Sequence, residues 1–231
     1  MTDKSLTTAT SAEVAAFLDQ VRQAPSRGDT GRGRLIFALD ATASRQPSWD
    51  RAATVQGQMF VEAERLGGLD VQLIYYRGFG ECRASRWVDR PGELVRLMTG
   101  VMCRAGETQI ARVLRHALKQ ATERRVHALV FVGDACEESI DELGRIAGEL
   151  ALRGVKAFLF REGEDPKAAL AFGQIAELTG GAHCRFDAGS PDQLRQLLGA
   201  VAAYAAGGRR ALLAAAERGA GPVRLLARQV R

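Results

Sequence analysis

The stretch LIFALDATAS, residues 35–44, changes abruptly from an apolar run to oxygen-bearing side chains. Residues 35–39 are all apolar, which is typical of a strand that is buried on both faces of a sheet. Asp40, Thr42 and Ser44 then place a carboxylate and two hydroxyls at alternate positions. Such an ending indicates either a polar turn or one part of a site that is built from oxygen atoms.

The remainder of the chain alternates between short apolar runs and longer amphipathic stretches. This alternation predicts an α/β fold: a doubly wound, Rossmann-like, mostly parallel six-stranded sheet with helices on both faces. The Gly-Phe-Gly link at 78–80 is short enough for a hairpin, so one edge strand is expected to be antiparallel. The expected strands are 35–40, 71–77, 82–88, 127–134, 155–160 and 182–186, and the expected helices are 10–22, 48–66, 91–103, 108–123, 139–153, 166–179 and one from 190.

The net charge of +5 is concentrated at the end of the chain. Residues 201–231 contain six arginines and one glutamate, whereas residues 1–200 contain 26 basic and 26 acidic residues. We therefore expect three parts: an N-terminal helix and loop over 1–33, the α/β domain over 34–206, and a basic, Arg-rich extension over 207–231. A neutral domain offers no basic face, so nucleic acid is not the expected partner.

The cysteines and the apolar runs indicate a cytoplasmic protein. The four cysteines are scattered without a CxxC pair, which argues against a disulfide framework and against a zinc site. The first twenty residues have no apolar segment of the kind found in signal peptides. No apolar run approaches the roughly 18 residues that span a bilayer, so no membrane partner is expected.

A second acid ends a second apolar strand. The run HALVFVGD, residues 127–134, closes on Asp134, and Thr108 of the sequence GET comes just before an expected helix. In open parallel sheets the carboxyl ends of the strands meet at one edge, where ligands bind near a reversal of strand order. If the first and fourth strands are neighbours, Asp40 and Asp134 converge there. The candidate metal ligands are Asp40, Thr42, Ser44, Thr108 and Asp134.

Two carboxylates and three hydroxyls form a set of hard oxygen donors, which suits Mg²⁺, with Mn²⁺ or Ca²⁺ as alternatives. Two carboxylates balance the charge of the ion, and hydroxyls add oxygen atoms without further charge. A cation held in this way favours an anionic oxygen on its open side. The alternative is that Asp40, Ser44 and Thr108 only cap helices or form turns.

The same residues carry a resemblance to a known family. DATAS at 40–44, Thr108 and Asp134 resemble the metal-ion-dependent adhesion site (MIDAS) of von Willebrand factor A (VWA) domains, whose pattern is Asp-x-Ser-x-Ser, a distant Thr and a distant Asp. The resemblance covers roughly residues 34–206. The sequence departs from the pattern at Thr42, where serine is usual; threonine keeps the hydroxyl and adds a methyl group.

The resemblance implies a cytosolic, bacterial-type interaction module. In such a module the bound Mg²⁺ engages an acidic side chain, Asp or Glu, of a protein partner. Related bacterial proteins often work beside AAA+ ATPases, which makes such an ATPase a candidate partner by family analogy. No catalytic residue is expected, and the protein is not expected to be an enzyme.

Two other functions stay open at this point. A metal-dependent hydrolase of phosphoesters would need a nucleophile or general base beside the metal, and none is evident. An RNA-associated VWA protein is supported only by the basic extension. The glycines at 31–33 precede the first strand, so they do not form a dinucleotide fingerprint, and the sequence contains no phosphate-binding P-loop.

Three side chains near the expected site have two interpretations each. Trp49 is either an anchor for a partner or packs beneath the loop that follows the first strand. Cys103 and Cys136 are either redox-sensitive or simply small buried thiols. The three histidines are interpreted as packing or surface residues.

Overall fold

The computed structural model describes residues 32–64, 66–186, 191–219 and 221–231. Residues 32–231 form one compact unit. The helix expected at 10–22 lies outside the described residues. Within the described ranges, no helix is long and apolar enough to cross a lipid bilayer.

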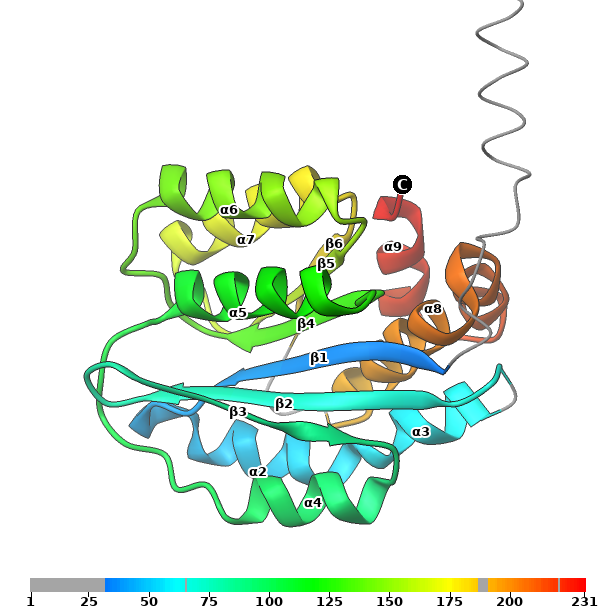
Figure 1. Ribbon diagram of the computed structural model, residues 1–231, viewed down its shortest axis with the longest axis horizontal. Helices are drawn as coiled ribbons and strands as arrows, with labels where there is room; N and C mark the ends of the chain where they lie inside the picture. The colour runs from blue at the N-terminus through cyan, green and yellow to red at the C-terminus, as the bar shows by residue number, and fades with distance from the viewer. Residues whose placement is uncertain (1–31, 65, 187–190, 220) are drawn as a thin grey trace, which may run out of the picture. The chain divides into compact units, whose positions relative to one another are not determined.

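A single six-stranded sheet runs through the unit in the order β3-β2-β1-β4-β5-β6 (Figure 1). All neighbouring strands are parallel except β2 and β3, which form an antiparallel pair. The predicted fold class is confirmed, including the antiparallel edge strand, and the first and fourth strands are neighbours, which is the condition for Asp40 and Asp134 to converge. The strands are β1 (Gly33–Asp40), β2 (Leu69–Arg77), β3 (Glu81–Val88), β4 (Ala128–Gly133), β5 (Lys156–Arg161) and β6 (Ala182–Arg185).

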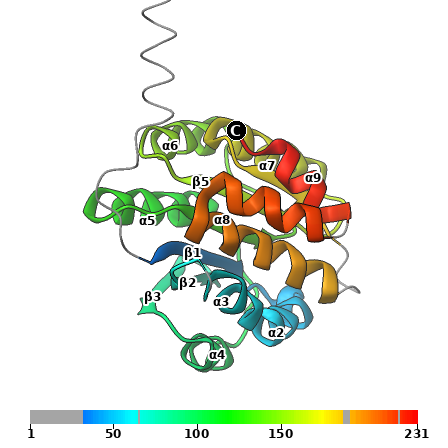
Figure 2. The same cartoon turned by 90° about the vertical axis from the view of Figure 1, so that its right-hand side faces the viewer.

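Helices cover both faces of the sheet, as Figure 2 shows. One core cluster joins odd-numbered β1 residues such as Leu35 and Phe37 to α2, α3, α4, α8 and α9, and a second joins Ile36 and Ala38 to α5, α6 and α7. The unbroken apolar character of residues 35–39 follows from this burial on both sides. The helices are α2 (Gln46–Val55), α3 (Gly57–Glu64), α4 (Pro91–Thr99), α5 (Ile110–Glu123), α6 (Ile140–Leu152), α7 (Pro166–Thr179), α8 (Pro191–Arg218) and α9 (Gly221–Gln229), with a short 3₁₀ turn η1 (Ala43–Arg45) before α2.

Three of the expected helices differ most from the structure. The helix expected at 48–66 is two helices, α2 and α3, which meet at Gly57, and glycine weakens a helix interior. α4 ends at Thr99 rather than near 103, with Gly100 as its C-cap. α5 begins at Ile110 rather than 108, because Thr108 forms hydrogen bonds with another loop that are described below.

The chain after residue 206 packs on the same core. α8 is kinked at Gly208, where φ is 68° and ψ is −165°, a conformation that only glycine adopts readily. Beyond the kink, Leu212, Leu226 and Val230 are buried in the cluster that contains Leu35. Figure 2 shows α8 and α9 lying across this face of the sheet.

The close approach of Gly181 to β5 gives a test of the packing at the sheet edge. A Cβ atom at Gly181 would lie 1.9 Å from the carbonyl oxygen of Ala157, a backbone atom that cannot move aside easily. We expect Gly181→Ala to lower the free energy of unfolding by about 1–3 kcal/mol, as overpacking does. Gly148→Ala, in α6 with open space around it, is the control and should raise stability by about 0.5–1 kcal/mol. Urea unfolding of both variants checks this, and equal effects would contradict it.

Candidate functional site

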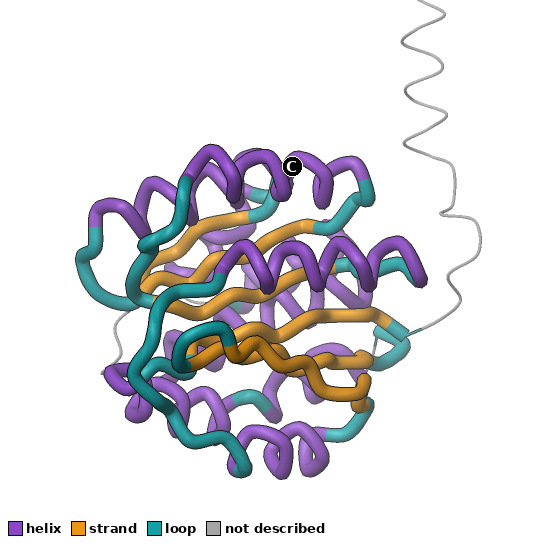
Figure 3. Tube along the Cα trace, turned by 60° about the vertical axis from the view of Figure 1, so that its left-hand side comes forward, coloured by secondary structure: helices purple, strands orange, loops and turns teal. Residues whose placement is uncertain are grey.

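A pocket of about 290 Å³ lies at the carboxyl ends of β1 and β4, and all five predicted ligand residues line it. Figure 3, in which the left-hand side of Figure 1 comes forward, shows the loops gathered at this end of the strands. The pocket is named the cup below. It is lined by Asp40, Thr42, Ala43, Ser44, Ala105, Gly106, Thr108, Asp134, Ala135 and Glu137.

Asp40 is the most buried acid of the cup. It ends β1 and is only 2% exposed, and its Oδ1 accepts a hydrogen bond of 2.7 Å from the backbone N–H of Thr42. Burial raises the pKa of Asp40 above its usual value, the hydrogen bonds from Thr42 oppose this, and the charge of Asp134 adds to it. A buried carboxylate without a full set of donors is a costly arrangement for a stable fold.

Tyr76 lies beside Asp40 in the sheet, opposite it in the β1–β2 register. Its side chain is fully buried, and its hydroxyl lies close to the Asp40 carboxylate without forming a hydrogen bond of ordinary geometry. Burial raises the pKa of Tyr76 well above its usual value, and the charge of Asp40 raises it further. Tyr76 therefore stays a neutral hydroxyl next to the floor of the cup, a neighbour that sequence reasoning did not identify.

Ser44 and Asp134 bring the loops after β1 and β4 into contact. The Ser44 hydroxyl donates a long hydrogen bond of 3.5 Å to Oδ2 of Asp134. Both side chains reach solvent, since Ser44 is exposed and the Asp134 side chain is 28% exposed. The open side of the cup is therefore on the side of Ser44 and Asp134, and its closed side is at Asp40.

Thr108 is held in place by a reciprocal pair of hydrogen bonds. Its backbone N–H donates to Oε2 of Glu137, and the Glu137 backbone N–H donates to Oγ1 of Thr108, both at 3.0 Å. Next to it, the Glu138 carboxylate accepts the backbone N–H groups of Ile110 and Ala111 in the first turn of α5. This clamp joins the start of α5 to the loop after β4, so Thr108 is placed beside Asp134.

Arg45 supplies a buried positive charge that the sequence did not reveal as part of the site. Its side chain is 3% exposed, its Nη1 forms an ion pair with Glu162, and the same atom lies 3.7 Å from Oδ2 of Asp134. The Ser48 hydroxyl also donates to Glu162. Although Arg45 directly follows the DATAS motif, its partner Glu162 is 117 residues away, and only the fold reveals their contact.

The donor set of the cup fits a hard cation. Among the described residues, no three His, Cys, Asp or Glu side chains lie close enough together to hold a metal ion. An ion in the cup would therefore depend on the hydroxyls of Thr42, Ser44 and Thr108 as well as on two carboxylates. Mg²⁺ accepts such oxygen donors and retains water molecules in its remaining positions.

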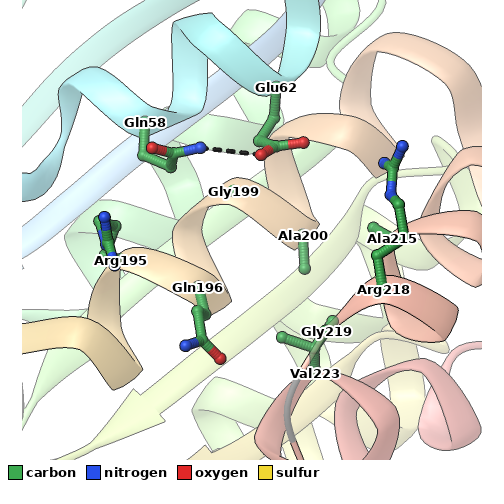
Figure 4. A pocket seen from close by; sticks show the side chains of 10 residues that line it. All are labelled: Gln58, Glu62, Arg195, Gln196, Gly199, Ala200, Ala215, Arg218, Gly219 and Val223. Carbon is green, nitrogen blue, oxygen red and sulfur yellow. Dashed lines mark hydrogen bonds between the residues drawn. The ribbon is translucent and has the colours of Figure 1, made fainter.

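A second pocket, of about 300 Å³, lies among α3, α8 and α9 and is drawn in Figure 4. Its acid Glu62 accepts a hydrogen bond of 2.8 Å from Gln58, and two arginines, Arg195 and Arg218, lie around it. None of the described residues that line this pocket lies at a strand end, and its charges, one acid beside two arginines, do not favour a cation. The cup is therefore the better candidate for the predicted chemistry.

The other side chains singled out near the site are mostly structural. Trp49 is 2% exposed and donates from Nε1 to the carbonyl of Met98, so it packs beneath the loop. Burial raises the pKa of Cys103 to about 11 and also raises that of Cys136. Both thiols are therefore protonated at neutral pH, which is the less reactive form.

Comparison with known proteins identifies the fold. Neither the known family models nor the curated proteins match this sequence. Among solved structures, an aerotolerance-related membrane protein from Bacteroides fragilis with multiple mutations to serine is 13% identical, with a TM-score of 0.56 over 72% of this chain and 96% of that one. The SpRpn10 VWA domain is 15% identical, with a TM-score of 0.56 over 72% of this chain and 94% of that one.

The pilus adhesin SpaC from Lactobacillus rhamnosus GG, in an open conformation, is also similar. It is 10% identical, with a TM-score of 0.60, and the match covers 77% of this chain but 30% of the adhesin. All of these identities are low, so the likeness concerns the fold alone. The chain has the α/β fold of von Willebrand factor A domains.

The burial of Asp40 gives a stability test that does not involve a ligand. Because its pKa is raised in the folded state, the ionised carboxylate lowers stability at neutral pH, and this cost disappears as the pH falls below the unfolded-state pKa. Asp40→Asn keeps an acceptor for the Thr42 N–H and removes the charge. In EDTA at pH 7, the variant no longer carries a buried charge. We therefore expect its free energy of unfolding to exceed that of the wild type by about 0.5–2 kcal/mol, a gain typical of substitutions that remove a costly functional group.

The measurement is urea unfolding at neutral and at mildly acidic pH. The advantage of Asp40→Asn should shrink as the solution is acidified. A variant that is less stable than the wild type at both pH values would show that Asp40 serves the fold rather than a ligand.

Proposed function

We propose that this protein is a metal-dependent protein-interaction module in which Mg²⁺ in the cup engages an acidic side chain of a partner. The observation that carries the proposal is the gathering of five oxygen-bearing side chains from three separate segments in one pocket. If these residues only capped helices or formed turns, Asp40, Thr108 and Asp134 would not need to line the same pocket. Mn²⁺ or Ca²⁺ are alternative occupants with the same preference for oxygen.

The division of the cup into a closed and an open side supports a binding role. Asp40, Thr42 and Thr108 would hold the ion from the buried side, and Ser44 and Asp134 from the side that reaches solvent. The bound ion supplies a positive charge that attracts an anionic oxygen. Nη1 of Arg45 lies 3.7 Å from Oδ2 of Asp134, so its positive charge partly balances the charge of this carboxylate.

Binding is favoured over catalysis by the side chains that line the cup. The described lining residues include no histidine, cysteine or lysine, and Glu137, the one lining carboxylate outside the proposed ligand set, already accepts the backbone N–H of Thr108. The hydroxyls present are the proposed ligands. A hydrolase acting on phosphoesters therefore has less support than an interaction module.

The class of partner follows from the chemistry of the cup. A protein that presents Asp or Glu on a protruding segment would supply a carboxylate oxygen as a further ligand of the ion. The structural neighbours include an adhesin, whose name describes attachment, and a VWA domain. An AAA+ ATPase as the partner and a cytoplasmic, bacterial setting are proposals that rest on the sequence resemblance.

The direct test is stabilisation by the metal. An ion that binds only the folded state at a concentration of 100 times its Kd adds about 2.7 kcal/mol of stability. That increment raises the Tm of a domain of this size by about 5–10 °C. We expect Mg²⁺ to produce such a rise in the wild type and to have little effect on Asp134→Ala.

Asp192→Ala is the matched control. It removes a carboxylate that is 75% exposed on α8 and paired with Arg195, so it should keep the full response to Mg²⁺. Melting curves in Mg²⁺ and in EDTA, followed by circular dichroism, give the comparison. If wild type and Asp134→Ala respond identically, the proposed metal site is wrong.

A further inference from the structure

The turn between β2 and β3 exposes an aromatic side chain next to the cup. Phe79 at its tip is 81% exposed, and Met102, on the connection between α4 and α5, is 70% exposed. Figure 1 places this turn at the same end of the sheet as the carboxyl ends of β1 and β4. A single exposed apolar residue has no special meaning, so the surroundings of Phe79 decide its interpretation.

The backbone of the turn is fixed on the segment that carries Thr108. Gly78 and Gly80 have φ values of 58° and 90°, and a Cβ atom at Gly106 would lie 2.2 Å from the Gly78 carbonyl oxygen. That carbonyl accepts hydrogen bonds from the backbone N–H of Glu107 and the side chain of Gln109. Gly106 also lines the cup, so the turn and the cup share a wall.

Two arginines strengthen the same connection. Arg77 forms a two-bond ion pair with Glu81 and donates from Nη1 to the Met102 carbonyl at 2.7 Å. Arg112 of α5 donates to the Gly80 carbonyl. Phe79 is therefore presented by a rigid turn rather than by a loose loop, and little conformational entropy would be lost when it meets a partner.

The charges around Phe79 are mainly positive. Four arginines lie around the turn, and the acids beside them are Glu81 and Glu107. Arg83 is 70% exposed, and Arg104 is exposed and is tied by its backbone N–H to the Ala41 carbonyl at the rim of the cup. The four arginines are Arg77, Arg83, Arg104 and Arg112.

We propose that Phe79, Met102, Arg83, Arg104 and Arg112, named here the turn patch, dock an acidic protein segment that carries a large apolar side chain. Aromatic residues and arginine are the side chains that contribute most at protein interfaces. The excess of positive charge selects an acidic partner. The inference deepens the proposed function, on which it rests, because the same segment would present one carboxylate to the cup and its apolar side chain to Phe79.

The probe for this inference is a library of random peptides displayed on phage and selected on the full chain in buffer that contains Mg²⁺. We expect the selected peptides to combine Asp or Glu residues with a large apolar residue. The affinity of a synthetic copy is then measured by fluorescence anisotropy. Phe79→Ser should weaken binding about tenfold or more, as loss of a central aromatic contact does.

Matched control variants distinguish the loss of a contact in the turn patch from the general effect of a surface substitution on peptide binding. Leu152→Ser changes an apolar side chain that is 88% exposed on α6, and it should leave the affinity unchanged. Arg83→Glu should weaken binding, whereas Arg90→Glu, which alters a guanidinium that is 78% exposed beyond the other end of β3, should not. The effect of Arg83→Glu should diminish at high salt, because salt screens exposed charges.

The outcomes distinguish this inference from the proposed function. Peptides that lose affinity with Asp134→Ala but not with Phe79→Ser would reject the patch and keep the metal-dependent function. Peptides that lose affinity with Phe79→Ser but not with Asp134→Ala or EDTA would support the patch and reject the metal-dependent function. Selection of peptides without acidic residues would reject the patch, and so would binding of homopolymeric RNA at the arginines in place of peptides.

Discussion

The parallel pairing of β1 with β4 is the constraint on which the site depends. These strands are far apart in the sequence, and each ends in or just before an acid at the same edge of the sheet. Residues 35–39 pair with 128–132, so Asp40 and Asp134 leave the sheet as neighbours. A change in strand order would separate the two carboxylates, and no rearrangement of loops could restore the cup. The strand order is therefore the main determinant of where the two carboxylates lie.

Local contacts determine the positions of the site residues that the strand order does not place. Thr108 belongs to neither strand, and its position depends on the reciprocal hydrogen bonds with Glu137. Arg45 provides the counter-charge for Glu162 and lies next to Asp134. Removing one member of such a buried pair leaves an uncompensated charge, so the pair is sensitive to substitution even if its net contribution to stability is small.

Much of this arrangement could be predicted from the sequence, because apolar runs and the Gly-Phe-Gly link specify strands and a hairpin directly. The convergence of Asp40 and Asp134 was also predictable, since strand ends in a parallel sheet share an edge, and Thr42, Ser44 and Thr108 were singled out by their hydroxyls and their place near these ends. Their gathering in one pocket agrees with that expectation, whereas metal binding stays a prediction. The break at Gly57 was missed because the apolar pattern continues through it. Arg45 with Glu162, and Tyr76 beside Asp40, depend on long-range packing that no local pattern encodes.

Glu138 occupies backbone N–H groups that could otherwise bind an anion at this edge of the sheet. The N-terminus of a helix at this edge often attracts an anion directly, through its free N–H groups. In α5 those of Ile110 and Ala111 are already bound to the Glu138 carboxylate. With Asp40, Asp134 and Glu137 nearby, the empty cup would repel an acidic segment. Attraction of a carboxylate into the cup would then be conditional on the cation, whereas the arginines of the turn patch would attract an acidic segment with or without it.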